Sequence, residues 1–457
     1  MTTSIRPTPT PPRDYRFPRC ERLALDNGLK LVIASVDKLP VVSIAMVVDA
    51  GSSSEPAGRE GVAHITAHAL AEGTARFTGH ELAERFELLG ASLDSRADWD
   101  AAIVSTTVLS SRFDDALALM SEVLREPSFP DREIERLKGE RLAELLQLQA
   151  EPRGLADEMF NRFLYDSTSR YARPELGGAD TVGALSAEEV RAFYKSRYVP
   201  GAMTLVVAGN VSVSHVQSVA LRVFEDWESD TPPAAVVLDQ PARHYRAVHI
   251  VRKEDAPQSE LRLGHVGLPR VHPDYFPVLV MNSILGGLFG SRINLNLRER
   301  HGFTYGARSE YDWRRGAGPF AVSTAVKSDA TGAAVRETLM EVERIRSESV
   351  SSEELSLATS YLAGVFPIRF ESTAAIARAL VAQAVFGLPD DYFDTYRRNV
   401  TSVTSQAVHR AAELHVHPDL FQLVVVGDPN VARAQLASAE LGVTTIYDAD
   451  GEPEPTI

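Results

Sequence analysis

LSAEEVRAFYKSRYVPGAMTLVVAGNV, residues 185–211, returns in altered form as VTSQAVHRAAELHVHPDLFQLVVVGDP, residues 403–429. Each stretch has the pattern of a helix, a turn at a proline and a buried strand that ends at a glycine. Any helix–strand unit shares some of this pattern, but one constant offset of 218 residues favours an internal duplication. That offset relates the following pairs: Pro200 and Pro418, Leu205 and Leu423, Gly209 and Gly427.

The duplication predicts two related domains of an α+β fold, because strands and helices are mixed within each half. A chain of 457 residues also exceeds the size of one ordinary hydrophobic core. The boundary falls in ESDTPPAAVVLDQPARH, where prolines and polar residues interrupt the pattern. In chain order we predict an extended N-terminal arm, a first domain, a linker and a second domain, at residues 1–20, 21–230, 231–243 and 244–450.

Local patterns divide the start of the first domain into strands and helices. GLKLVIASV and VVSIAMVVDAG, residues 28–36 and 41–51, are rich in β-branched residues and predict a hairpin of two strands. REGVAHITAHALAEG predicts a helix that ends at Gly73, and GHELAERFELLG predicts a second helix that ends at Gly90.

Composition restricts the class of partner. The formal net charge of -15 disfavours nucleic acid, which requires a basic surface. The single cysteine, Cys20, excludes an internal disulfide framework and a cysteine-based zinc cluster. The opening residues lack the apolar core of a signal peptide, and no later run is long enough to span a bilayer, so we expect a cytoplasmic protein that does not bind membranes.

Two histidines, His64 and His68, are spaced to share one face of the helix predicted at residues 59–73. This spacing lets two imidazoles bind one zinc ion, which then needs a third protein ligand. In a chain with twelve histidines, two that lie close together by chance are an equally simple explanation. The residue between them that could act in catalysis, Ala67, has no functional group.

The surrounding stretch, GSSSEPAGREGVAHITAHALAEGTARFTGHELAERFELLGASL at residues 51–93, resembles the pitrilysin and insulinase family of metallopeptidases. These inverted zincins carry the motif H-x-x-E-H. The resemblance extends over nearly the whole chain. It implies a metallopeptidase clamshell half, in which each of two homologous domains is a mainly antiparallel sheet packed against helices, and it implies Zn²⁺ as the cofactor.

The resemblance also implies the third ligand, a glutamate on a later helix that ends shortly before a proline. Glu144 lies 76 residues after His68, and Pro152 follows it. Glu140, one helical turn earlier, is the alternative ligand or a supporting residue.

In its second domain the family carries an arginine and a tyrosine that bind the substrate backbone and stabilise the reacting carbonyl. GSRINLNLRERHGFTYGARS, residues 290–309, resembles that segment, and the implied residues are Arg298 and Tyr305. A guanidinium and a phenol can both donate hydrogen bonds to a developing oxyanion.

In the family the glutamate between the two histidines is the general base, and Ala67 cannot replace it. Loss of a general base reduces the rate by roughly two to four orders of magnitude. Glu72 is a weak substitute because it lies at the predicted helix end. The alanine is consistent both with a replaced base in an otherwise active enzyme and with a natural chain that binds peptide without cleaving it.

The resemblance implies a substrate strand that pairs with a sheet edge, here ASLDSRADWDAAIVSTTVLSS at residues 91–111. Trp99 lines that cleft or is an ordinary core tryptophan. Chains of this length pair as a homodimer or with a related chain around a closed chamber, with a hinge near residues 228–244. We therefore expect a weakly active or inactive zinc endopeptidase acting on peptides or unfolded polypeptides. The alternatives are a non-catalytic peptide-binding subunit of an active homologous chain, and a structural relative without metal.

Overall fold

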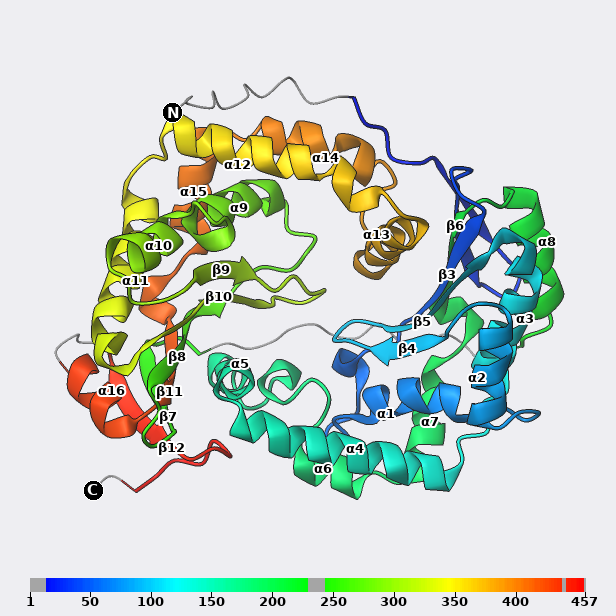
Figure 1. Cartoon of the computed structure of the whole chain (residues 1–457), viewed down its shortest axis with the longest axis horizontal. Helices are drawn as coiled ribbons and strands as arrows, with labels where there is room; N and C mark the ends of the chain where they lie inside the picture. The colour runs from blue at the N-terminus through cyan, green and yellow to red at the C-terminus, as the bar shows by residue number, and fades with distance from the viewer. Residues whose placement is uncertain (1–13, 229–242, 438–440, 456–457) are drawn as a thin grey trace, which may run out of the picture.

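The structure, a computed structural model, describes residues 14–228, 243–437 and 441–455. It contains two six-stranded sheets with helices on both faces, one sheet in each half of the chain (Figure 1). This confirms the predicted α+β fold of two related halves. The domain limits remain a prediction, because the first 13 residues of the arm and nearly all of the linker at 231–243 lie outside the described residues.

The first sheet has the strand order β1-β2-β6-β3-β5-β4. Its strands are β1 (Cys20–Ala24), β2 (Lys30–Ser35), β3 (Val41–Val48), β4 (Asp94–Ala97), β5 (Ala102–Leu109) and β6 (Met203–Gly209). The predicted hairpin of β2 and β3 is wrong, because β6 lies between them, parallel to β2 and antiparallel to β3. The strand at the end of the repeated unit therefore occupies the middle of the sheet.

The second sheet has the equivalent order, β12-β7-β11-β8-β10-β9. Its strands are β7 (Ala247–Arg252), β8 (Gln258–Val266), β9 (Ala307–Tyr311), β10 (Pro319–Lys327), β11 (Gln422–Gly427) and β12 (Val443–Tyr447). Here β11 is parallel to β7 and antiparallel to β8, as β6 is to β2 and β3. The two halves differ at one edge, since β12 runs parallel to β7 whereas β1 runs antiparallel to β2.

Sixteen α-helices are assigned in the described part of the chain. In the first half they are α1 (Val62–Ala69), α2 (Gly79–Leu88), α3 (Phe113–Arg125), α4 (Asp131–Ala150), α5 (Pro152–Leu164), α6 (Ala179–Ala184), α7 (Ala187–Arg197) and α8 (Val213–Phe224). In the second half they are α9 (Tyr275–Asn282), α10 (Arg292–Asn294), α11 (Thr331–Ser347), α12 (Ser352–Val365), α13 (Thr373–Phe386), α14 (Tyr392–Thr401), α15 (Ser405–His415) and α16 (Pro429–Leu436). Two π-helical turns, η6 (Ser283–Gly287) and η7 (Leu295–Arg300), flank α10.

The repeated unit forms for the same local reasons in both halves. Ser186 caps α7 by accepting a hydrogen bond from the Glu189 amide, and Thr404 caps α15 in the same way. A close approach then requires glycine at the end of β6, because a Cβ on Gly209 would lie 2.3 Å from the Val41 carbonyl oxygen.

Each half contributes one helix to the sheet of the other half. In Figure 1, α5 lies against β8 and β11, although it precedes the linker, and α13 lies against β3 and β6 of the first sheet. Residues of α5 and β11 share one buried cluster, and residues of α13, β3 and β6 share another. This exchange joins the two halves through apolar burial on one face of each sheet.

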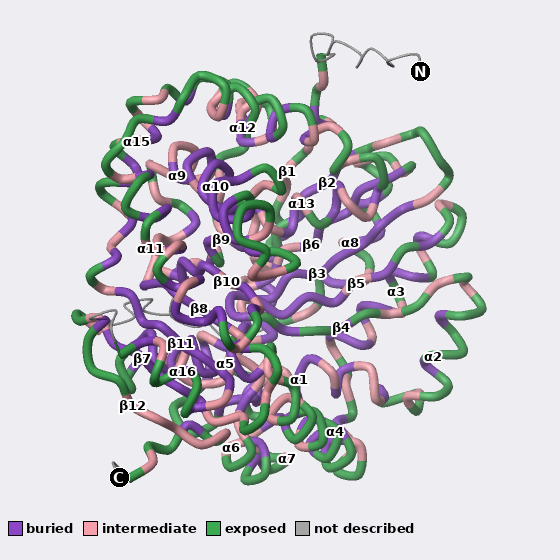
Figure 2. The backbone as a smooth tube through the Cα atoms, turned by 60° about the vertical axis from the view of Figure 1, so that its left-hand side comes forward, coloured by how far each residue is buried: buried purple, intermediate pink, exposed green. Residues whose placement is uncertain are grey.

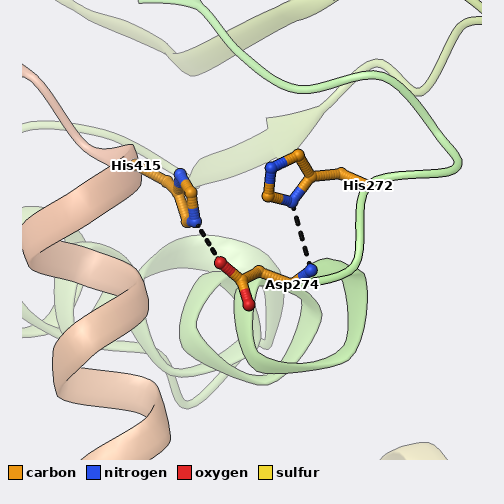
Figure 3. Close-up of side chains that lie close together, drawn as sticks. All are labelled: His272, Asp274 and His415. Atoms are coloured by element: carbon orange, nitrogen blue, oxygen red, sulfur yellow. Dashed lines mark hydrogen bonds and ion pairs between the residues drawn. The ribbon is translucent and has the colours of Figure 1, made fainter.

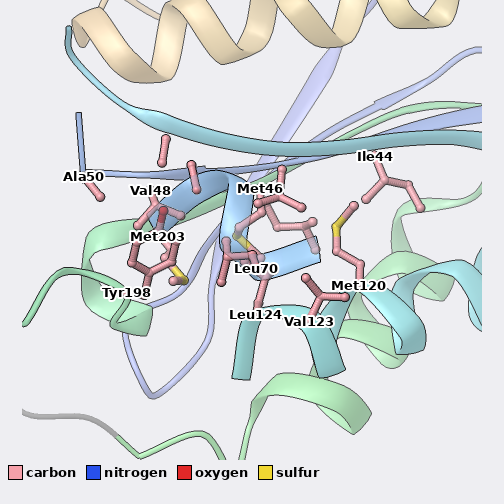
Figure 4. Close-up of a cluster of buried hydrophobic side chains, with 14 of the residues drawn as sticks. Ile44, Met46, Val48, Ala50, Leu70, Met120, Val123, Leu124, Tyr198 and Met203 are labelled. Atoms are coloured by element: carbon pink, nitrogen blue, oxygen red, sulfur yellow. The ribbon is translucent and has the colours of Figure 1, made fainter. Parts of the chain in front are cut away.

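The other face of each sheet packs against helices of its own half. Along β3, Ile44, Met46 and Val48 contact the core formed with α1 and α3, whereas Ala45 and Val47 contact the α13 side (Figure 4). The central strands of both sheets are accordingly buried (Figure 2). This alternation follows from the two-residue period of a strand.

The described end of the N-terminal arm and the long apolar segment of the second half both pack against the rest of the molecule. The described end of the arm is packed, since Phe17 stacks 4.2 Å from the Phe393 ring centroid of α14. The segment Tyr275–Arg300 is long and apolar enough to cross a membrane, contrary to the prediction that no run is. Of its most apolar window, 56% is buried inside the molecule, which is typical of a core helix.

Candidate functional site

The two histidines of the motif lie together on α1. Their ring centroids are 4.4 Å apart, and both side chains are half-buried. The helix begins at Gly61, whose amide donates a hydrogen bond to Glu55 Oε1, as does the amide of Ala63. The sequence therefore correctly predicts that the helix presents both imidazoles on one face.

Ala67 is fully buried in the core of the first half. Its carbonyl oxygen accepts a 2.5 Å hydrogen bond from Ser95 Oγ on β4, which fixes this turn of α1 against the sheet edge. A glutamate at this position would place a carboxylate in a site that now holds only a methyl group.

The two glutamates proposed as third ligand are engaged elsewhere. Glu144 is 59% exposed and lies 3.3 Å from Arg141 Nη1, whereas Glu140 is 57% exposed and accepts a 2.6 Å hydrogen bond from Arg136. Arg136 also forms a 2.7 Å ion pair with Glu72, the weak substitute for the base. Among the described residues, His64, His68 and either glutamate do not form a group whose ligand atoms lie within 4.8 Å of one another.

Arg141, which the sequence reasoning missed, lies on α4 one helical turn before Glu144, and its charge acts on His64. Its guanidinium is buried and donates to the carbonyl oxygens of Leu176 (3.2 Å) and Gly177 (3.3 Å). Burial, His68 and the Arg141 charge together lower the pKa of the His64 imidazole to about 3. An arginine one helical turn before Glu144 was the available sequence signal.

These residues do not fit a zinc ion. A divalent cation next to a fixed, buried guanidinium meets direct charge repulsion. The candidate carboxylate is also drawn toward that guanidinium. The prediction that His64, His68 and Glu144 bind zinc is therefore not supported by this arrangement.

Arg298 and Tyr305, in contrast, are presented for binding. Arg298 lies on η7, stacks 4.7 Å from the Phe289 ring centroid and is 35% exposed. Tyr305 follows in the next loop with 92% of its side chain exposed. Both line a cavity of about 500 Å³, together with Arg153, Glu260 and the buried Arg262.

A larger cavity lies along the edge of the first sheet. It has a volume of about 890 Å³ and is lined by residues of β3, β4, β5, the end of α2 and helix α13. Because β4 pairs only with β5 in the sheet, its other edge is available to an additional strand. The segment at 91–111 thus includes a sheet edge, as expected.

Of the two alternatives for Trp99, a cleft residue or an ordinary core tryptophan, its burial favours the core tryptophan. The side chain is 7% exposed, and its ring packs 4.9 Å from the Tyr171 centroid. The guanidinium of Arg314 lies 4.3 Å from the Trp99 centroid and comes from the loop between β9 and β10. Trp99 is therefore a buried contact between the two halves.

Comparison with known families decides the classification. The family described as "Insulinase (Peptidase family M16)" matches residues 31–173, and "Peptidase M16 inactive domain" matches residues 184–362. The chain belongs to the M16 family of pitrilysin- and insulinase-like peptidases. The uncharacterized zinc protease YmxG of Bacillus subtilis is 24% identical to this M16 chain over 77% of it and 85% of YmxG.

Two further proteins, one known from its sequence and one from its crystal structure, are similar to this chain. A probable mitochondrial-processing peptidase subunit beta of Arabidopsis thaliana is 23% identical, over 90% of this chain and 78% of that protein. A crystal structure described as the peptidase M16 inactive domain from Pseudomonas fluorescens is 27% identical with a TM-score of 0.84, covering 90% of this chain and 98% of that one. The chain is thus a peptidase-family protein whose relatives include zinc proteases.

Proposed function

We propose that this M16 chain is a non-catalytic subunit that binds peptide and supplies Arg298 and Tyr305 to the metal site of a homologous, active partner chain. The observation that carries the proposal is the buried Arg141 guanidinium, which lies 3.3 Å from Glu144, the expected third ligand, in a motif that also has Ala67 in place of the base. One chain therefore combines a site unsuited to metal with an open arginine–tyrosine pair.

The chemistry of the pair supports this division of roles. Arg298 and Tyr305 line one cavity and remain partly or largely exposed, so a peptide carbonyl can reach both. During hydrolysis the carbonyl oxygen gains negative charge, and a guanidinium and a phenol stabilise it by donating hydrogen bonds. The pair needs no metal in its own chain for this role.

The peptide class follows from the sheet edge. A strand added to β4 forms main-chain hydrogen bonds, which favour extended peptides or unfolded polypeptides with little sequence preference. The name of the Arabidopsis relative, subunit beta of a processing peptidase, supports an assembly of homologous chains. Two such chains facing each other would enclose the substrate in a chamber.

Reconstitution tests the proposal. The purified chain is assayed alone and mixed with a homologous M16 chain from the same genome that retains H-x-x-E-H, on an unstructured fluorogenic peptide with excess Zn²⁺. We expect no chelator-sensitive cleavage by this chain alone, a stable complex on gel filtration and cleavage by the pair.

The controls separate binding from catalysis. When the partner's motif glutamate is replaced by glutamine, the two chains should still form the complex, but the complex should not cleave the peptide. Chelator-sensitive cleavage by this chain alone would overturn the proposal and favour a base-deficient zinc peptidase.

A further inference from the structure

A second group of metal-ligating side chains lies far from the motif, in the second half. His272 and Asp274 precede α9, and His415 is the last residue of α15. One ligand atom from each lies within 4.8 Å of the others, and this is the only such group of three or more among the described residues (Figure 3).

The hydrogen bonds of the group decide which atoms a metal ion could use. His272 Nδ1 accepts a 3.1 Å hydrogen bond from the Asp274 amide, which uses the only lone pair of this nitrogen, so the other ring nitrogen, Nε2, on the side of His415, is the ligand atom (Figure 3). His415 Nε2 lies 2.7 Å from Asp274 Oδ2, and a metal ion bound by these two atoms would replace the proton that they share. All three residues are half-buried, which leaves room for water to complete a coordination shell.

The neighbouring side chains show which other groups could take part in the site. His265 is excluded as a ligand because both its nitrogens are used: Nδ1 bonds the Val266 carbonyl at 2.8 Å, and Nε2 accepts from the His417 amide at 3.1 Å. The charges that act on His272 are those of His415 and Asp274, with no guanidinium among them. The buried Arg270, two residues before His272, stacks on the Tyr275 ring, 3.6 Å from its centroid.

We infer that His272, Asp274 and His415 form a binding site for a divalent transition metal ion such as Zn²⁺. Two imidazole nitrogens and one carboxylate oxygen are a ligand set that zinc and its first-row neighbours accept, with one or more waters. The ion would join the loop before α9 to the end of α15. Because α9 leads through η6, the non-helical residues 288–291 and α10 into η7, which carries Arg298, this cross-link would stabilise the support of the arginine–tyrosine pair.

The test uses the full-length chain, freed of metal with a chelator and then titrated with Zn²⁺ against a chromophoric indicator. We expect about one equivalent of zinc in the unmodified chain and in the His64→Asn/His68→Asn double variant. His415→Asn and, independently, His272→Asn should weaken binding at least about tenfold. Co²⁺ in place of Zn²⁺ should give visible absorption bands that the same two variants abolish.

His417→Asn is the matched control, since His417 lies beside the group but outside it, and it should bind zinc like the unmodified chain. Circular dichroism establishes that each variant is folded, and addition of Zn²⁺ should raise the Tm only of chains that retain the three ligands. Zinc binding that survives both single variants but is lost in the His64→Asn/His68→Asn chain would overturn the inference. Absence of binding by the unmodified chain would overturn it as well and leave the group an ordinary ion pair.

Discussion

Arg141 Nη1 lies 3.3 Å from Glu144 Oε2, so the carboxylate expected to hold zinc faces a buried guanidinium on its own helix. The same guanidinium is held by the carbonyl oxygens of Leu176 and Gly177, in the loop before α6. The motif therefore differs from a zinc peptidase in two independent ways, the missing base and the added cation.

Ala67→Glu alone should not create a peptidase. The new carboxylate would supply a base, but the ligands would still be opposed by Arg141. The measurement is cleavage of the same unstructured peptides by the zinc-loaded variant and by the zinc-loaded unmodified chain, each with and without chelator. Cleavage by the single variant that a chelator stops would show that the metal site is complete and that the alanine alone disables this chain.

Removal of Arg141 should raise the metal affinity of the motif. Arg141→Leu releases Glu144 and removes the repelling charge, so Co²⁺ or Zn²⁺ binding at His64 and His68 should tighten at least about tenfold. The measurement is made in a His415→Asn background, which removes the second proposed site. Arg132→Leu, on the same helix with 94% of its side chain exposed, is the control and should leave the affinity unchanged.

Tyr305→Phe should reduce kcat of the reconstituted pair by about 100-fold, the typical effect of removing one oxyanion donor. Because only the phenolic hydroxyl is lost, KM and complex formation should change little. Tyr361→Phe removes a half-exposed phenol of α12 outside the cavity and serves as the control. Equal kcat values for both variants would exclude Tyr305 from catalysis.

Trp99→Ala should destabilise the contact between the halves. The variant loses the packing on Tyr171 and Arg314, and replacement of a buried tryptophan by alanine typically costs about 3–5 kcal/mol. Urea unfolding followed by circular dichroism measures the loss, with Trp99→Phe as a milder replacement. Unchanged unfolding of the alanine variant would contradict the buried interdomain role.

The Arg292–Glu354 pair should make stability depend on acid pH. The hydrogen bond from Arg292 is the largest influence and, against the opposing effect of burial, lowers the pKa of the Glu354 carboxyl from 4.5 to about 2. A depressed folded-state pKa stabilises the protein above pH about 4.5, and this contribution is lost as the pH falls toward 2.

Glu354→Gln should therefore lower the Tm at pH 7 and reduce the fall in Tm between pH 4.5 and the most acid pH that the protein tolerates. Glutamine can still complete the capping box with Ser351, so α12 keeps its start. Glu353→Gln, on the exposed side of the same turn, is the control. If Tm falls equally with acid pH in both variants, the Arg292–Glu354 pair does not contribute to the pH dependence of stability.

The family resemblance implied the sheet edge near residue 94, whereas sequence patterns alone predicted the duplication and the helix that carries His64 and His68. These features depend on local periodicity, capping residues and glycine stops, which neighbouring residues determine. The order of β2, β6 and β3 was not predicted correctly, because the pairing of β6 with β2 and β3 depends on contacts between residues 155–174 positions apart.

The sequence by itself determined the family, the two related halves and the absence of a base at position 67. Only the tertiary structure decided that Arg141 is buried beside His64, that Trp99 joins the halves, and that His272 and His415 meet. Each of these depends on which elements pack together: the loop at Leu176 on α4, the β9–β10 loop on the first sheet, and α15 on α9. The sequence specifies the functional group of each side chain, but long-range packing determines its neighbours and its burial.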